Sequence, residues 1–295
     1  MNILFISSGL MPDYQCDSLF HGLREVFGNG VVDINKVEYM YKTFPLSEKP
    51  NLYGKGFTLY GLLEDESDID RSDIESKIKH RFFDFIVYGS IHRCQTYVET
   101  VLDIYPPENI VFIDGEDDGK VINLLLNRGF YFKRELQAEN RFILPIHFSV
   151  PKDKFINDIY ELEKLSFRSH CDPRDRSTYI YEKEEDYYQQ YQESFFGFTT
   201  KKAGWDCLRH YEIIAQGCAP YFPDLLDCPY LTMHRFPRLE TIRLMEIADY
   251  CVQNEYLDME GYLSNLEYLF NYAKKYLTTA AVASYVIEQL KSYSN

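Results

Sequence analysis

The first thirty residues, MNILFISSGLMPDYQCDSLFHGLREVFGNG (residues 1–30), predict a strand, a loop and a helix in that order. Residues 2–7 form a short apolar run that ends at Ser-Ser-Gly, and residues 18–27 have the apolar spacing of a helix. The Gly-Asn-Gly turn at residues 28–30 ends this helix, and a second apolar run follows at residues 31–37. Apolar strands that alternate with helices are typical of a parallel sheet buried on both faces.

The same alternation continues toward the middle of the chain. Apolar runs lie at residues 85–88, 110–113 and 130–132, and residues 96–104 have a helical pattern. A further run at residues 142–148 contains Pro145, which indicates an edge strand or a loop. We therefore predict a Rossmann-like α/β domain over residues 1–150.

The second half of the chain repeats the pattern with shorter strands. Expected strands lie at residues 165–167, 194–199 and 219–222, and an expected helix spans residues 205–216. The tyrosine-rich segment near residues 182–193 is expected to be a surface helix, and the chain is almost wholly helical from residue 239. We predict a second Rossmann-like domain over residues 151–295 that faces the first across a cleft, with its last helices able to pack back on the N-terminal domain.

The charge of the chain bears on the partner. The 295 residues include 31 Lys and Arg against 46 Asp and Glu, a net charge of −15. A field of this sign repels phosphate backbones and anionic membrane surfaces, so nucleic acid is expected to be a poor partner. A small anionic ligand remains compatible, because it needs only a local cluster of donors.

Seven cysteines and no C-x-x-C pair indicate reduced, mostly buried thiols in a cytoplasmic protein. Their spacing fits no zinc signature, and we expect no metal and no cofactor. No apolar stretch reaches about 18 residues, so no membrane span is predicted. The N-terminus lacks a basic segment and a small-residue cleavage site, and it is interpreted as a strand rather than a signal peptide.

Polar residues follow the expected strands at their carboxyl ends, where open parallel sheets bind ligands. Asp17 follows the first strand, His92 the third and Asp114 the fourth. The alternative for each is a structural role: Asp17-Ser18 suits a helix N-cap and Asp114-Gly115 suits a turn. Neighbouring candidates for the same wall of the cleft are Asp13, His21, Arg93, Glu116 and Asp117.

The most informative stretch is KKAGWDCLRHYEIIAQGCAP (residues 201–220). On a helix, Glu212 shares a stripe with Leu208 and Ala215, so its carboxylate needs a partner. That partner is either the hydroxyl pair of a ribose or, within the helix, Arg209. Basic residues that could neutralise a diphosphate occur as pairs: Arg174 and Arg176, Lys201 and Lys202, and Lys133 and Arg134.

Residues 188–223 resemble the C-terminal half of bacterial and viral GT-B glycosyltransferases. The positions that match the pattern of this group are Ser194, Gly204, Trp205, Asp206, Arg209, Glu212, Gly217 and Pro220. The start of the chain is also similar, so the resemblance covers roughly residues 1–238. It implies two Rossmann-like domains, with residues 1–150 on the acceptor side and a nucleotide-sugar bound mainly to the second.

The resemblance also implies roles for individual residues. Glu212 would bind the ribose, and Arg174 would bind the diphosphate with weaker help from Arg209 and Lys202. Retaining members with two glutamates eight positions apart would need an acid where this chain has Gly204, a donor-side position, so retention and inversion both remain open.

The activity implied by the resemblance is transfer of a sugar from a nucleotide-sugar donor to the hydroxyl of a carbohydrate or other acceptor, without a metal. An inverting reaction needs a general base near the acceptor hydroxyl. We favour Asp17 for this role, with His92 and Asp114 as further catalytic candidates. The alternative is a catalytically inactive GT-B-like protein that binds nucleotides or glycans.

Overall fold

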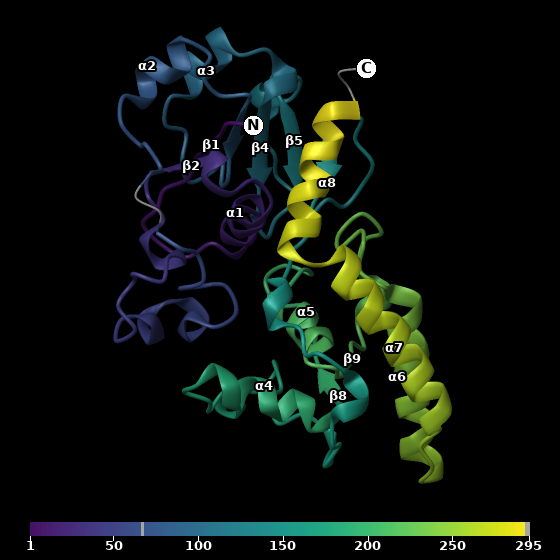
Figure 1. The fold of residues 1–295 in the computed structure, drawn as a ribbon. Coiled ribbons are helices and arrows are strands. Elements are labelled where there is room, and N and C mark those ends of the chain that lie inside the picture. Colours follow the sequence, from purple (N-terminus) through teal and green to yellow (C-terminus); the bar gives the residue numbers. More distant parts are fainter. Residues whose placement is uncertain (66–67, 293–295) are drawn as a thin grey trace.

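The computed structural model describes residues 1–65 and 68–292. It has two parallel sheets, one in each half of the chain, which lie one above the other along the long axis of the molecule (Figure 1). The N-terminal sheet has six strands in the order β2-β1-β3-β4-β5-β6. Its strands are β1 (Ile3–Ile6), β2 (Val31–Ile34), β3 (Phe85–Tyr88), β4 (Ile110–Asp114), β5 (Phe130–Lys133) and β6 (Ile143–Pro145). Ile3 of β1 pairs with Val31 on one side and Phe85 on the other, and the strand that contains Pro145 lies at the edge, as the sequence predicts.

Helix α1 (Tyr14–Phe27) follows β1 and begins earlier than predicted. Asp13 is its N-cap, and the side chain of Asp13 accepts hydrogen bonds from the backbone N–H groups of Gln15 and Cys16. The expected N-cap at Asp17-Ser18 is therefore wrong, because Asp13 satisfies the free N–H groups one turn earlier. The remaining helices of this half are α2 (Ile74–Lys79) and α3 (Val98–Ile104).

The C-terminal sheet has three parallel strands in the order β7-β8-β9. They are β7 (Ser166–Arg168), β8 (Ser194–Phe198) and β9 (Ala219–Tyr221), and the accompanying helices are α4 (Glu184–Gln192), α5 (Leu208–Ala215), α6 (Arg238–Asn254) and α7 (Met259–Tyr276). Helix α5 begins at Leu208, so Trp205 and Asp206 lie in the loop before it rather than on the predicted helix. Helix α4 lies at the surface, as expected, with Glu185, Asp186 and Gln189 exposed, but its other face buries Tyr187 and Tyr191.

The last helix, α8 (Thr279–Ser292), returns to the N-terminal half and lies beside α1 (Figure 1). The two helices approach so closely that a Cβ atom on Gly22 would meet the carbonyl of Thr279 well inside 3.0 Å. His21 faces this contact, because its Nδ1 lies 2.9 Å from Oγ1 of Thr279. His21 is therefore part of the helix packing and not of the wall of the cleft.

The two halves share one core. A single cluster of buried apolar side chains extends from Phe132 of the first sheet through Phe148 to Tyr211 and Tyr262 of the second half. Residue 151, the predicted start of the second domain, lies between β6 and β7. All seven cysteines are free, and five of them are buried. Among the helices of residues 1–65 and 68–292, none is long and apolar enough to cross a membrane.

Candidate active site

His92 and Asp114 lie together at the carboxyl end of the N-terminal sheet. Asp114 is the last residue of β4, and His92 belongs to the loop that follows β3. Nε2 of His92 lies 2.9 Å from Oδ2 of Asp114. The side chain of His92 is 29% exposed whereas that of Asp114 is fully buried. A buried carboxylate thus orients a histidine that solvent or a substrate can reach.

Two further side chains support Asp114 from strand β5. Tyr131 donates its hydroxyl to Oδ2 at 2.6 Å, and the ammonium of Lys133 lies 2.7 Å from Oδ1. Lys133 also donates to the carbonyl oxygen of Glu116 at 3.2 Å. These contacts, together with the one to His92, hold both oxygens of Asp114 in place.

Asp17 occupies a different environment. Its carboxylate is buried and accepts hydrogen bonds from the N–H of Asp13 at 2.8 Å and from the hydroxyl of Tyr60 at 3.0 Å. Burial raises the pKa of Asp17 well above its ordinary value, and the nearby charge of Asp13 adds to this effect. Because its oxygens already accept hydrogen bonds inside the core, this carboxyl group is poorly placed to take a proton from an acceptor.

A second group of charged residues borders the same edge. Arg93 lies between the carboxylates of Asp13, at 3.2 Å, and Glu116, at 3.1 Å. This bridge connects the loops that follow β1, β3 and β4. The prediction that polar residues after the strands lie close together therefore holds for Asp13, Arg93 and Glu116, which lie next to His92.

Arg209 is the central cation of the C-terminal half. It lies on α5 with 8% of its surface exposed, and it donates to Oγ1 of Thr199 at 3.2 Å and to the hydroxyl of Tyr179 at 2.9 Å. Its Nη2 has no hydrogen-bond partner among the described residues, and none of their carboxylates forms an ion pair with it. A buried guanidinium nitrogen without a hydrogen-bond partner is costly, so this position suits an anionic ligand.

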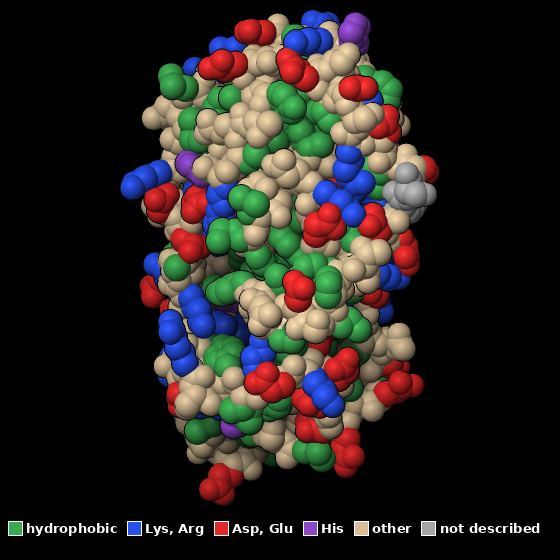
Figure 2. Space-filling view, turned by 90° about the vertical axis from the view of Figure 1, so that its left-hand side faces the viewer, with side chains coloured by type: hydrophobic (Ala, Val, Ile, Leu, Met, Phe, Trp, Pro, Cys, Tyr) green, Lys and Arg blue, Asp and Glu red, His purple; other side chains and the backbone are tan. Residues whose placement is uncertain are grey.

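Further positive charge gathers beside Arg209. The ammonium of Lys202 lies 5.2 Å from the ring centroid of Tyr179, the same tyrosine that accepts from Arg209. Desolvation lowers the pKa of Lys202, and the charges of Arg209 and Arg176 lower it further. Figure 2 shows Lys and Arg side chains gathered around a hollow at about the height of α5 in Figure 1. We call Lys202, Arg209 and Arg176 the cationic cluster.

Arg174, the favoured diphosphate ligand from the resemblance, is engaged elsewhere. Its guanidinium binds Asp172 through Nε at 3.1 Å and Nη2 at 2.8 Å, and it stacks 4.0 Å from the ring centroid of Phe198. The ion pair lowers the pKa of Asp172 to about 2. Arg174 thus carries its own counter-charge, in contrast to Arg209.

Glu212 lies on α5 with its carboxylate buried. The hydroxyl of Tyr187 donates to Oε2 at 2.8 Å, and the hydroxyl of Thr58 donates to Oε1. The ion pair with Arg209 that the sequence left open does not form, because the two side chains turn to different partners. Two hydroxyl groups therefore occupy the two oxygens, which is the contact that a ribose diol would make.

Thr58 reaches Glu212 from the N-terminal half of the molecule. Its φ is +72°, an uncommon conformation for a β-branched residue. Its hydroxyl also lies 2.7 Å from that of Tyr188, and the nearby Lys55 binds Glu182 at 2.6 Å. We call residues 53–58 the covering segment, because they connect the N-terminal half to α4 directly over Glu212.

Gly204 and the pair Lys133-Arg134 do not form a ligand surface. Gly204 is buried against the carboxylate of Glu135. Lys133 and Arg134 are also buried, Lys133 against Asp114 and Arg134 against Glu135. The interpretation of this pair as diphosphate donors is therefore wrong, because both charges are already neutralised inside the protein.

Sequence reasoning missed several residues of this site. Thr58, Tyr179, Tyr187 and Glu135 lie far along the chain from the groups they contact. The tyrosine content of residues 179–191 was a usable signal, because buried Tyr hydroxyls need partners. Nothing in the sequence around Thr58 indicates its contact with Glu212.

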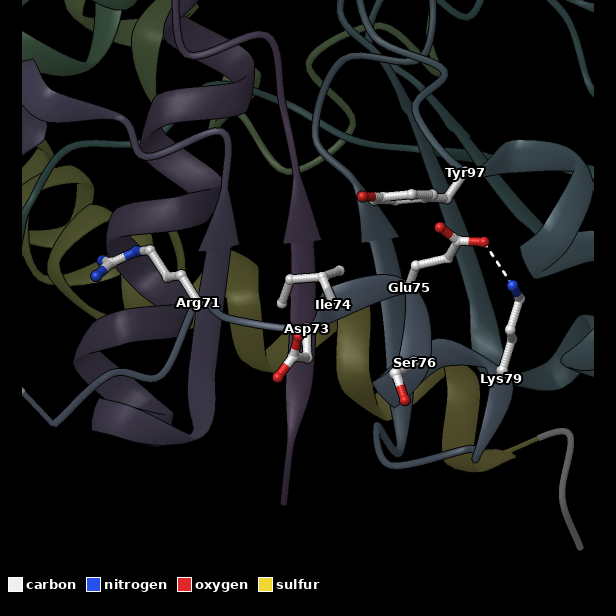
Figure 3. A pocket seen from close by; sticks show the side chains of 7 residues that line it. All are labelled: Arg71, Asp73, Ile74, Glu75, Ser76, Lys79 and Tyr97. Carbon is white, nitrogen blue, oxygen red and sulfur yellow. Dashed lines mark hydrogen bonds and ion pairs between the residues drawn. The ribbon is translucent and has the colours of Figure 1, made fainter.

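A separate hollow of about 580 Å³ lies on the outer side of the N-terminal half (Figure 3). It is lined by Arg71, Asp73, Ile74, Glu75, Ser76, Lys79 and Tyr97. Glu75 and Lys79 pair within it at 2.5 Å, and Arg71 is bound to Asp33 at 2.6 Å. Its arginine and lysine side chains are thus engaged in ion pairs, and it shares no residue with the site described above.

The similarity of this chain to known proteins is found by comparing structures. No family model and no curated protein matches its sequence. An α-glucosyltransferase solved in complex with UDP and a 13-mer DNA containing an HMU base is similar, with a TM-score of 0.50 and 11% identity over 99% of both chains. The α-glucosyltransferase in complex with UDP gives a TM-score of 0.46 at 11% identity, over 98% of this chain and 99% of that chain.

The chain has the GT-B glycosyltransferase fold. The predicted fold class, two Rossmann-like domains with parallel sheets, is thereby confirmed. One expectation is corrected by the same comparison. Nucleic acid was expected to be a poor partner because of the net charge, yet a protein of this fold was solved with DNA. Net charge alone does not exclude nucleic acid, because charges farther away than the Debye length, about 8–10 Å, are largely screened and the local field decides what binds.

Proposed function

We propose that this protein transfers a sugar from a nucleotide-sugar to a hydroxyl group of an acceptor. The cationic cluster binds the diphosphate of the donor, Glu212 binds the ribose, and His92 acts on the acceptor. Lys202 and Arg209 thus keep the donor-binding role that the resemblance gives them, and Arg176 takes the place of Arg174.

The observation that carries the proposal is the unpaired cation at Arg209. A purely structural arginine on a buried helix is expected to have a carboxylate partner, as Arg134 has in Glu135. Within the described part of the chain, Nη2 of Arg209 instead has no partner, and a second cation, Lys202, lies beside it. Phosphate oxygens would satisfy both groups, and arginine is well suited to phosphate because its donors form a planar fork.

The reaction breaks the bond between the anomeric carbon of the sugar and the phosphate oxygen, and forms a bond from that carbon to the acceptor oxygen. The nucleoside diphosphate leaves with the electron pair, and the cationic cluster stabilises the charge that develops on it. With Nε2–H of His92 donating to Asp114, Nδ1 is free to accept the proton of the acceptor hydroxyl. In this proposal, side-chain cations rather than a metal stabilise the leaving group.

Suitable first substrates come from the structural comparison. The similar α-glucosyltransferase was solved with UDP and with DNA containing an HMU base. We therefore propose UDP-glucose as the donor to test and the same kind of modified DNA, beside glycans, as the acceptor. An enzyme that acts on a base must take that base out of the stack, which an open edge beside His92 would permit.

The test is binding followed by transfer. The chain has one tryptophan, Trp205, in the loop before α5, so UDP binding can be followed by its fluorescence. Arg209→Gln should weaken UDP binding by about tenfold to a hundredfold, since a charge-assisted hydrogen bond contributes about 1.5–3 kcal/mol. Arg243→Gln, an exposed arginine on α6, is the matched control.

The proposal also requires turnover. Incubation with UDP-glucose and acceptor should release UDP and add one hexose mass to the acceptor. Absence of binding by any nucleoside diphosphate would overturn the proposal. Binding without transfer to any hydroxyl acceptor would favour a protein that only binds nucleotides.

A further inference from the structure

Glu135 comes from the N-terminal half but contacts the loop that carries the donor-side lysines. It follows strand β5, and 2% of its surface is exposed. Its carboxylate accepts the backbone N–H groups of Trp205 at 3.1 Å and Asp206 at 3.0 Å. A side chain of one half of the molecule thus fixes the backbone of a loop in the other half.

Gly204 makes room for this carboxylate. A Cβ atom at position 204 would lie 2.5 Å from Oε1 of Glu135 and 2.8 Å from Oδ1 of Asp117. Both distances are shorter than real Cβ contacts, so any larger residue at position 204 must displace the two acids. The carboxylate of Glu135 therefore fills the space in which the side chain of residue 204 would begin.

Arg134 strengthens the same junction. Its side chain is buried, and it pairs with Glu135 at 2.8 Å and with Asp117. It also donates to the carbonyl oxygens of Asp206 at 2.7 Å and Gly115 at 3.0 Å. The loop before α5 is thus held by an arginine and a glutamate that are adjacent in sequence.

The loop transmits this contact to the cationic cluster. The N–H of Lys202 donates to the carbonyl oxygen of Gly204 at 3.0 Å, so the backbone of Lys202 is tied to the residue that packs on Glu135. A shift of Glu135 would move Gly204 and with it Lys202. The side chain of Lys202 would then leave its position beside Arg209.

We propose that Glu135 is a positioning residue for the diphosphate of the donor: it sets residues 201–206 so that Lys202 joins Arg209 at the phosphates. This inference rests on the proposed function. It assigns to the acceptor-side half a direct influence on donor affinity, through a carboxylate at the place where the resemblance would put an acid at position 204.

The experiment compares a ligand that has phosphates with one that lacks them. UDP and uridine are titrated against the wild type, Glu135→Gln and Gly204→Ala, with melting temperature measured for each protein. Glu135→Gln loses the charge, and Gly204→Ala keeps the charge but displaces it. Both should raise the Kd for UDP about tenfold and leave the Kd for uridine within about twofold.

A second experiment tests whether a carboxylate at position 204 restores the UDP binding that is lost when Glu135 is removed. Glu135→Ala should weaken UDP binding, and Glu135→Ala combined with Gly204→Asp should recover most of it, because the acid then returns to nearly the same place from the other half of the molecule. A double variant that binds UDP no better than Glu135→Ala counts against the proposal.

The outcomes separate this inference from the proposed function. If the wild type binds no nucleoside diphosphate, the proposed function fails and this inference fails with it. If the wild type binds UDP and the variants bind it equally well, Glu135 is not a positioning residue, whatever their melting temperatures. An equal loss of UDP and uridine affinity would show a general loosening of the fold and would also overturn the inference.

Discussion

Oδ2 of Asp114 lies 2.9 Å from Nε2 of His92, and the two residues lie at the carboxyl ends of neighbouring parallel strands. This pairing leaves one ring nitrogen of His92 free to act on a substrate. His92→Gln should lower kcat by about 10²- to 10⁴-fold, the usual contribution of a general base. The Kd for UDP should change little, because His92 is not in the cationic cluster. A variant with wild-type kcat would remove His92 from the base role.

For Asp17, in contrast to His92, we expect substitution to change kcat only slightly. Its carboxyl group is buried and already accepts hydrogen bonds from the N–H of Asp13 and the hydroxyl of Tyr60, so it cannot readily reach an acceptor hydroxyl. Asp17→Asn preserves the shape and most acceptor capacity, and kcat should stay within about fivefold of the wild type. Loss of turnover comparable to that of His92→Gln, with the melting temperature retained, would restore Asp17 as the base.

The close packing of α1 on α8 predicts a stability effect at Gly22. Gly22→Ala places a methyl group against the backbone of Thr279, which cannot move without shifting α8. Overpacking of this kind costs about 1–3 kcal/mol. Urea denaturation should show a lower free energy of unfolding by that amount. Gly119→Ala is the control, because its nearest contact is a flexible Gln137 side chain at 3.4 Å; equal stability of the two variants would refute the prediction.

The pKa of Asp206 predicts a dependence of stability on pH. Burial raises it from an ordinary value of 3.8 to about 7, although the charge of Arg134 opposes the shift. The folded protein therefore binds more protons at this group than the unfolded chain does between about pH 4 and pH 7. Its contribution to stability is complete below pH 4 and is lost as the pH rises to about 7.

Asp206→Asn cannot titrate, so it isolates this effect. The free energy of unfolding of the wild type, relative to Asp206→Asn, should fall as the pH rises from 4 to 7 and level off above that. Asp103→Asn, an exposed acid on α3, should show no such trend. If the free energy of unfolding of the wild type, relative to that of Asp206→Asn, rises with pH, the prediction is contradicted.

The central strands of the first sheet were predictable because they are continuous apolar runs, and β1 and β4 bury every side chain. The starts of α1 and α5 were not, because Asp13 and Cys207 end the preceding loops in ways that hydrophobic periodicity does not register. His92 and Asp114 were predictable because parallel strands share a carboxyl edge. The partners of Glu212 were not, since Thr58 is 154 residues away and lies in a segment without regular secondary structure.

The covering segment leads to a prediction about donor affinity. Thr58 donates its hydroxyl to Oε1 of Glu212, the group proposed to bind the ribose. A ribose hydroxyl must displace that of Thr58 to reach the same oxygen. Thr58→Val removes the competing hydroxyl with little change in shape and should lower the Kd for UDP by about twofold to tenfold, since a neutral hydrogen bond contributes about 0.5–1.5 kcal/mol.

Stability should change in the opposite direction. Without UDP, Thr58→Val leaves a buried carboxylate oxygen without its donor and should melt at a lower temperature than the wild type. UDP should therefore raise the melting temperature of Thr58→Val more than that of the wild type, because the ligand supplies the missing hydroxyl. Thr58→Ser retains the hydroxyl and is the matched control. If Thr58→Val and the wild type respond equally to UDP, the ribose does not bind at this oxygen of Glu212, and the contact between Thr58 and Glu212 serves only to join the two halves of the molecule.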